Sequence, residues 1–369
     1  INHYAKDMFC VMVWYNKNME NYHSKLQQRY TVKLRVLEKE LPYFCTQFFN
    51  ARANVLEKQS QYAYAMDFKV FFYFIRDYFQ ELNNMPIRDI KPDIFNRITT
   101  HDLDAYLDYI ELYEFEGDHR HNGETGKSRK LSSIKSLCKY LLKENIINKN
   151  PAELVEMPKI HKKDIVVLNE EEKKRLLETI MYRQGMSEAQ AKLNSHCYLR
   201  DYAIMMLFLG TGMRVSELVG LNVNDINFKK NTARVIRKGG NTQHVYFSKQ
   251  VANALKQYLY GTGTGSRGSL VEDETEQALF ISLKRNRLTV RGIQKLIEKY
   301  SNITFSDDPE LKLHPHLLRK TYGTNLYLRT NDIKLVADQL GHSAISTTER
   351  HYVTSTEEHK KLAAIDVIE

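Results

Sequence analysis

The chain has 369 residues, of which 42% are hydrophobic and 27% are charged, a composition typical of globular proteins long enough for two or more domains. Lys and Arg outnumber Asp and Glu by 54 to 45, and the net charge of +9 favours a polyanionic partner, either nucleic acid or an anionic membrane surface. The longest apolar run, Met8 to Tyr15, is too short to cross a bilayer and has no signal-peptide pattern, so we expect neither a membrane span nor a signal peptide.

The four cysteines and the glycine-rich stretch 261–268 give no sign of a metal or nucleotide site. The cysteines are far apart and show no CxxC spacing, so reduced thiols in a cytoplasmic protein are the simplest interpretation of Cys10, Cys45, Cys138 and Cys197. The glycine-rich stretch lacks the GK[ST] ending of a phosphate-binding loop, which favours a surface connection.

The first third of the chain has the pattern of a helical domain. Aromatic and long side chains at helical spacing, with almost no Gly or Pro, predict helices between Tyr4 and about Gln80. The prolines in 83–98 mark a break. We expect the next helix to run from 101 to 114 with Thr100 as its cap, followed by a polar loop over 116–126.

Residues 127–143 are expected to form a helix with one apolar and one basic face. Their apolar residues recur at helical spacing, and the segment contains no acidic residue. From its sequence alone the basic face is either an ordinary solvated surface or a row that follows a phosphate backbone. The basic residues in question are Lys127, Arg129, Lys130, Lys135, Lys139 and Lys143.

A basic, proline-containing linker over 156–166 separates this region from a second pattern. We therefore predict an N-terminal helical extension over 1–40, a helical domain over 41–155, and a second domain over 167–369. In the second domain a β-like region is expected at 231–247. The predicted helices are 169–182, 199–209, 249–260, 290–300, 316–328 and 331–340.

Four short segments of the second domain resemble, in order and approximate spacing, the catalytic boxes of the tyrosine recombinases, also called the phage-integrase family. They are Thr-Gly-Met-Arg-Val-Ser-Glu-Leu (211–218), Ile-Arg-Lys-Gly-Gly (236–240), His-Pro-His-Leu-Leu-Arg-Lys (314–320), and Leu-Gly-His (340–342) followed by Tyr352. The resemblance extends from about residue 41 and is densest over 199–352.

The resemblance implies a mainly α fold with a small β-sheet, in which a SAM-like helical core-binding domain and a mixed α/β catalytic domain form a C-shaped clamp on DNA. It also implies that the basic helix over 127–143 lies against the duplex. The implied partners are double-stranded recombination sites, a homo-tetramer linked by exchange of the amphipathic tail (356–369), and accessory directionality factors. No cofactor or metal ion is implied.

Two arginines suit the chemistry of a phosphodiester, because negative charge on the phosphoryl group increases as it is attacked. Arg214 and Arg319 can each donate paired hydrogen bonds to non-bridging oxygens, which a lysine cannot reproduce. Glu217, three residues after Arg214, is expected to orient its guanidinium. By the resemblance, His316 and His342 also contact the phosphate.

The resemblance also implies roles for Lys238 and Tyr352. Lys238, on an expected hairpin, would protonate the departing 5′-oxygen; Arg237 and Lys229 or Lys230 fit that position less well. Tyr352 would be the nucleophile and form a 3′-phosphotyrosyl bond. The commonest family spacing places the tyrosine one residue earlier, where this chain has His351.

Several functions share most of this set of residues. We expect a site-specific recombinase for the integration and excision of a mobile element, with chromosome or plasmid dimer resolution as the alternative. A type IB topoisomerase, a telomere resolvase, a catalytically inactive DNA-binding regulator and an anionic-membrane protein fit the sequence less well.

Overall fold

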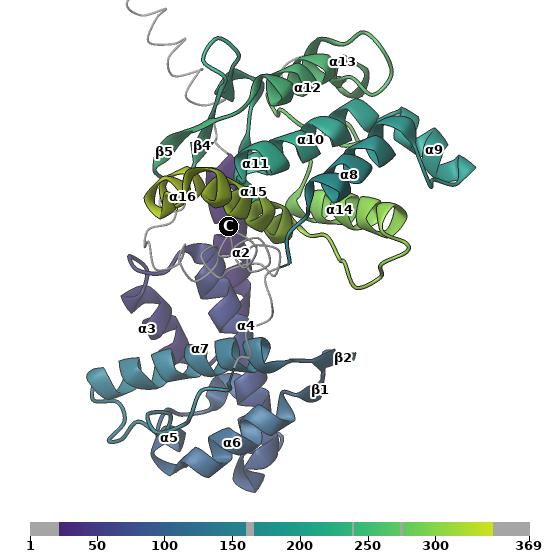
Figure 1. Cartoon of the computed structure of the whole chain (residues 1–369). Helices are drawn as coiled ribbons and strands as arrows, with labels where there is room; N and C mark the ends of the chain where they lie inside the picture. The colour runs from purple at the N-terminus through teal and green to yellow at the C-terminus, as the bar shows by residue number, and fades with distance from the viewer. Residues whose placement is uncertain (1–21, 160–165, 238–239, 274–275, 342–369) are drawn as a thin grey trace, which may run out of the picture. The chain divides into compact units, whose positions relative to one another are not determined.

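The computed structural model describes residues 22–159, 166–237, 240–273 and 276–341. The chain divides into two compact units, Ile1–Lys162 and Lys163–Glu369, called unit 1 and unit 2 below. Figure 1 shows both units with their elements labelled. Both are mainly helical and each contains one small antiparallel sheet, which confirms the expected fold class.

In its described residues, unit 1 consists of helices and a single β-hairpin. Its elements are α2 (Tyr22–Glu38), α3 (Tyr43–Ala51), α4 (Lys58–Tyr78), η1 (Gln80–Leu82), η2 (Ile87–Asp89), α5 (Ile94–Arg97), α6 (Thr100–Tyr109), β1 (Leu112–Phe115), β2 (Asp118–His121) and α7 (Glu124–Lys143).

Aromatic side chains fill the core of unit 1. The ring of Phe71 packs edge-on against that of Tyr106, with centroids 5.1 Å apart, and both side chains are fully buried. Each buried ring contributes up to about 3 kcal/mol by leaving water. Leu34 and Leu37 of α2 join the same core, and α2 packs along α4. Residues 22–38 are therefore integrated into unit 1.

The expected helix over 101–114 and loop over 116–126 are wrong in detail. Thr99, not Thr100, caps α6: its side chain and Asp102 form reciprocal hydrogen bonds with each other's backbone N–H groups. The helix ends at Tyr109, and β1 and β2 then pair through a two-residue turn. Glu116 (φ 56°) and Gly117 (φ 80°) supply the two positive φ angles that such a turn needs.

Helix α7 confirms the predicted apolar face. The side chains at helical spacing are fully buried, namely Leu131, Ile134, Leu137, Cys138 and Leu141. Together they anchor α7 to the rest of the unit 1 core.

Unit 2 contains the segments that carry the four boxes. Its elements are α8 (Glu170–Tyr182), α9 (Glu188–Ser195), α10 (Tyr198–Thr211), α11 (Val215–Gly220), η3 (Val223–Asp225), β3 (Ile226–Asn227), β4 (Thr232–Ile236), β5 (Thr242–Tyr246), α12 (Lys249–Tyr260), α13 (Arg267–Leu270), α14 (Val290–Thr304), α15 (Pro315–Thr330) and α16 (Ile333–Leu340). Helices α9 and α13 were not predicted from the sequence.

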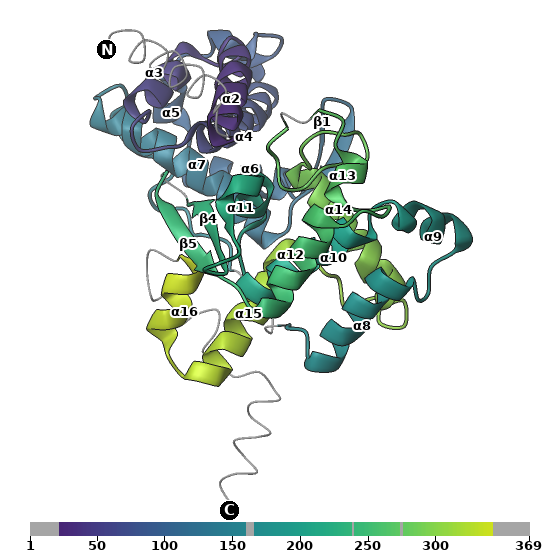
Figure 2. The ribbon, with the colours of Figure 1, turned by 90° about the horizontal axis from the view of Figure 1, so that it is seen from above.

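Helix α10 is the centre of unit 2, and it packs against α8, α12 and α15. The three strands form a sheet in the order β3-β4-β5, with Val235 opposite Gln243 and Ile236 opposite Thr242. In both ribbon views α16 lies beside the β4–β5 hairpin (Figure 2). The end of α16, the hairpin and the start of α11 therefore come together at one place.

The cysteines of the described residues are buried free thiols. Burial raises the pKa of Cys138 and of Cys197 to about 12, so both stay protonated at neutral pH. Cys10 lies outside the described residues. Within the described ranges, no helix is both long and apolar enough to cross a membrane.

Candidate active site

The described residues include part of the predicted catalytic set. Within them lie Arg214, Glu217, His316 and Arg319. Outside them lie Lys238, His342 and Tyr352, together with the tail 356–369.

Arg214 lies at the start of α11 and is held by Glu217. The backbone N–H of Arg214 donates to one carboxylate oxygen of Glu217, and its Nη1 donates to the other, each at 2.8 Å. Glu217 is buried, whereas the Arg214 side chain is 35% exposed. One side of the guanidinium is thus held by the buried carboxylate of Glu217, and another side is open to solvent.

Arg319, on α15, is buried and reaches two backbone carbonyls. Its Nη1 donates to Gly212 O at 2.7 Å and its Nη2 to Leu340 O at 2.6 Å. Gly212 ends α10 with φ +61°, and a Cβ there would lie 2.4 Å from Tyr322 Cδ1. Glycine at position 212 therefore lets the end of α10 approach α15 closely. Arg319 of α15 can then reach the carbonyl at the end of α10.

His316 is exposed in the first turn of α15, three residues before Arg319 and so on the same side of the helix. Its ring stacks on that of His314, with centroids 6.4 Å apart. His314, to which the sequence assigns no role, caps α15: its Nδ1 accepts from Leu317 N–H at 3.2 Å. Desolvation and the charge of Lys320 lower the pKa of His314.

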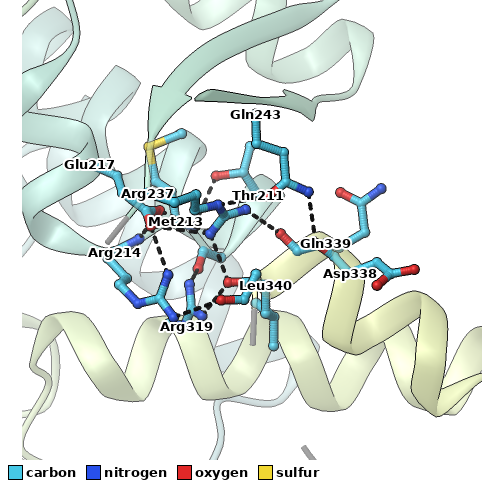
Figure 3. Close-up of polar contacts among 12 residues, drawn as sticks. Thr211, Met213, Arg214, Glu217, Arg237, Gln243, Arg319, Asp338, Gln339 and Leu340 are labelled. Atoms are coloured by element: carbon cyan, nitrogen blue, oxygen red, sulfur yellow. Dashed lines mark hydrogen bonds and ion pairs between the residues drawn. The ribbon is translucent and has the colours of Figure 1, made fainter. Parts of the chain in front are cut away.

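The C-terminal turn of α16 is where the site converges (Figure 3). Arg214 Nη2 donates to Gly341 O at 3.0 Å, next to the Leu340 carbonyl that Arg319 binds. The last carbonyls of a helix have no intrahelical donor and form its negative end, so cations stabilise them. The two predicted arginines thus meet at consecutive carbonyls, directly before His342.

A third arginine, Arg237, occupies the centre of this cluster (Figure 3). It is buried, and its Nη1 donates to Leu340 O at 2.7 Å and to Glu217 at 3.1 Å. The sequence indicates Arg237 only as a less suitable substitute for Lys238. Its partners Leu340 and Glu217 lie 103 and 20 residues away along the chain, so no local pattern could identify this role.

Arginine side chains gather in this cluster. Among the described residues, Glu217 pairs with Arg214 and Arg237, while Arg319 donates to the carbonyls of Gly212 and Leu340. Burial lowers the pKa of Arg237, the carboxylate of Glu217 opposes that effect, and the charge of Arg214 adds to it. Because an arginine stays protonated even so, the site is cationic and suited to an anion such as a phosphate.

Comparison with known protein families shows to which family the protein with this cationic site belongs. The model of the phage integrase family matches residues 166–359. The chain is a member of this family, the tyrosine recombinases. It is therefore a DNA-binding enzyme of DNA recombination.

Relatives of this tyrosine recombinase agree with the assignment. It is 31% identical over 363 residues to the tyrosine recombinase XerC of Caldanaerobacter subterraneus subsp. tengcongensis, covering 92% of this chain and 93% of that protein. The Tn1549 transposon integrase in complex with transposon right end DNA has a TM-score of 0.60 at 18% identity, covering 88% of this chain and 99% of that one. XerH recombinase bound to its difH substrate has a TM-score of 0.56 at 22% identity, covering 89% and 83%.

The basic residues at the start of α7 have partners within unit 1. Lys127 pairs with Glu111 and Glu124, each at 3.0 Å. Arg129 and Lys130 share the buried carboxylate of Asp67. The Lys130 side chain is itself only 7% exposed, so it cannot reach a phosphate without leaving Asp67.

The later basic residues of this recombinase's α7 differ in exposure. Lys135 is half-buried, and its Nζ donates to Val155 O at 2.6 Å. Lys139 and Lys143 are exposed at the C-terminal half of the helix. In the row expected from the four-residue spacing, Lys139 and Lys143 are therefore the members with exposed side chains.

Proposed function

We propose that this tyrosine recombinase cuts and rejoins double-stranded DNA at defined sites through Tyr352. The observation that carries the proposal is the meeting of Arg214 and Arg319 at the carbonyls of Leu340 and Gly341. Two guanidiniums at neighbouring positions can each donate paired hydrogen bonds to one phosphate. The partial exposure of Arg214 leaves the cluster accessible to it.

In the proposed reaction, the phenolate of Tyr352 attacks phosphorus and forms a 3′-phosphotyrosyl bond while the bond to the 5′-oxygen breaks. Arg214 and Arg319 stabilise the charge that develops on the non-bridging oxygens, assisted by His316 and His342. Lys238 gives a proton to the departing 5′-oxygen.

A 5′-hydroxyl of another strand then attacks the phosphotyrosine and reverses the step. Because the covalent bond conserves the phosphodiester, no nucleotide cofactor is needed. Repeating the exchange on the second pair of strands passes through a Holliday junction.

We infer that Lys139 and Lys143 contact the DNA backbone, with weaker roles for Lys127, Arg129 and Lys135, whose ammonium or guanidinium groups already have acceptors. Lys130 is left out because it is buried on Asp67. The two units would close around the duplex, and the tail 356–369 would link a homo-tetramer, on which accessory directionality factors act.

The biological role we propose is integration and excision of a mobile element. The fold similarity to the Tn1549 transposon integrase supports it. Dimer resolution is the second candidate, because the sequence identity to XerC extends over nearly the whole chain. Sequencing the DNA that is covalently bound to the protein in cells distinguishes the two: element ends support the first, and a single chromosomal locus supports the second.

The test of the chemistry is trapping of the covalent intermediate. Incubation with a nicked suicide site is expected to give a protein–DNA adduct that Tyr352→Phe does not form. Tyr260→Phe, a change at an exposed tyrosine of α12, is the matched control and keeps the adduct. An adduct in Tyr352→Phe would show that another residue is the nucleophile. Relaxation of supercoils without strand exchange would favour a topoisomerase.

A further inference from the structure

Arg237 makes hydrogen bonds to three separate parts of unit 2. Its Nε donates to Gln243 Oε1 on β5 at 2.9 Å, and its Nη1 donates to Glu217 on α11 at 3.1 Å. Nη1 and Nη2 also donate to the carbonyls of Leu340 and Gln339 on α16, at 2.7 and 2.8 Å. One guanidinium thus joins the hairpin, α11 and α16 (Figure 3).

The backbone of Arg237 forms the base of the β4–β5 turn. Its N–H donates to Asn241 O at 2.8 Å, and its carbonyl accepts from Gly240 N–H at 3.1 Å. The next residue in the chain is Lys238. Any shift of Arg237 relative to α16 therefore moves the residue to which Lys238 is joined in the chain.

The contacts of Arg237 also hold the last turn of α16 in place. Gly341 follows α16 with φ +63°, and a Cβ there would lie 2.6 Å from Arg237 Cζ. Gln243 adds a second link, because its Nε2 donates to Asp338 O at 3.0 Å. The last turn of α16, which leads into His342, is therefore held against the hairpin by side-chain contacts on both Arg237 and Gln243.

Glu217 connects Arg237 to Arg214. Oε1 of Glu217 accepts from Arg214 Nη1 at 2.8 Å and from Arg237 Nη1 at 3.1 Å. The side chain of Arg237 is 8% exposed and that of Arg214 is 35% exposed. Arg237 thus shares the carboxylate that holds the more exposed Arg214, and through that carboxylate it can orient the phosphate-binding group.

We propose that Arg237 is a positioning residue for DNA cleavage, which fixes the hairpin base, the Glu217–Arg214 pair and the end of α16 in one arrangement. The proposal rests on the proposed function. It requires the planar guanidinium: a lysine ammonium at this place keeps the charge but cannot reach acceptors on three elements at once. Misplacement of catalytic groups by about 1 Å costs about 100-fold in rate.

The experiment measures single-turnover cleavage of a suicide site at saturating protein, DNA affinity, and thermal unfolding for Arg237→Lys. We expect cleavage about 100-fold slower, with DNA affinity changed less than about 3-fold, because phosphate contacts dominate affinity. Arg200→Lys is the matched control: Arg200 is a buried arginine of unit 2 that bonds Asp201 and Ile281 O. Its change is expected to lower the unfolding temperature but not the cleavage rate of the folded protein.

A milder variant keeps the proposal testable if Arg237→Lys does not fold. Gln243→Met removes the acceptor of Arg237 Nε and the link to Asp338 O. We expect cleavage to slow about 5-fold, as for the loss of about 1 kcal/mol of orienting hydrogen bonds, with unchanged DNA affinity. In the double variant the two effects combine less than multiplicatively, because both act through Arg237.

The proposal is overturned if Arg237→Lys cleaves at the wild-type rate. If Arg237→Lys does not fold, a wild-type cleavage rate in Gln243→Met overturns it. So does a loss of DNA affinity that accounts for the whole decrease in activity. Absence of any adduct from the wild-type protein refutes instead the proposed function, so the two failures are distinguishable.

Discussion

Arg319 and Arg237 donate to the same carbonyl oxygen, that of Leu340, at 2.6 and 2.7 Å. Two cations share one neutral acceptor because it belongs to the last turn of α16, where the helix dipole is negative. Arg319 comes from α15 and Arg237 from the end of β4, so this oxygen joins two of the sequence segments that resemble catalytic boxes.

Gly341→Ala should destabilise unit 2 and impair cleavage. The new Cβ would lie 2.6 Å from Arg237 Cζ in a residue with φ +63°, so backbone strain of about 1–2 kcal/mol adds to displacement of the guanidinium. Thermal unfolding and adduct formation measure both effects. Gly117→Ala, also at positive φ but with nothing within 4 Å, is the control for strain alone. Equal losses in the two variants would exclude a steric effect on Arg237.

Glu217→Gln should be among the most destabilising single substitutions in unit 2. It removes the only carboxylate that the structure shows paired with Arg214 and Arg237 among the described residues, leaving two like charges close together. Loss of one partner of a buried ion pair costs about 3–5 kcal/mol. Glu272→Gln, at an exposed carboxylate paired with Arg285, should change stability by less than about 0.5 kcal/mol. Urea unfolding compares the two variants.

His314 should make the stability of unit 2 depend on pH. Its folded-state pKa lies below the ordinary value of 6.5, so the unfolded chain binds the proton more tightly. The stabilising contribution is complete above pH 6.5 and decreases as the pH falls below it, when Nδ1 can no longer accept from Leu317. His314→Ser, which caps in either condition, should reduce this pH dependence. A parallel decline of unfolding temperature in both proteins would contradict the assignment.

Lys238→Ala should slow cleavage of ordinary DNA but much less so when the scissile 5′-oxygen is replaced by sulfur. A thiolate leaves without a proton, so the proposed general acid becomes dispensable, whereas general acid catalysis contributes about 100-fold or more with oxygen. Lys256→Ala is the control at a lysine of α12. A defect of the same size with both substrates would assign Lys238 to phosphate binding instead.

Lys139→Gln and Lys143→Gln should each reduce the slope of log affinity against log salt by about 1, because each ammonium that contacts a phosphate displaces counterions. Lys130→Met should leave the slope unchanged and act on stability, since its ammonium is bound to Asp67. Filter-binding titrations between low and moderate salt give the slopes. Unchanged slopes in the Lys139 and Lys143 variants would remove these two lysines from the DNA interface.

The parts of the fold predicted correctly from sequence are those set by local patterns. The apolar side chains of α7 recur at helical spacing, and Asn169, Ser248 and Thr289 cap the helices that follow them. The β1–β2 hairpin was missed because its turn, Glu116-Gly117, lies in a polar stretch that is equally typical of a loop.

From residue spacing alone, without the family resemblance, contacts of the site were predictable only where the residues occur close together in sequence. Arg214 and Glu217 are three residues apart, and their contact follows from helical geometry. Arg237 meets Gln339 across 102 residues, and Lys130 meets Asp67 across 63. Burial and ion pairing over such separations depend on tertiary packing, which a basic residue in a one-dimensional pattern does not reveal.

The backbone acceptors at the end of α16 have a consequence for affinity. A free arginine side chain loses about 2 kcal/mol of rotamer entropy when it is immobilised. In this chain Arg214 and Arg319 are already immobilised by the carbonyls of Gly341 and Leu340 before any DNA arrives. The entropic cost of ordering these two side chains is therefore incurred during folding, and in the proposed reaction the scissile phosphate meets a preorganised pair of cations.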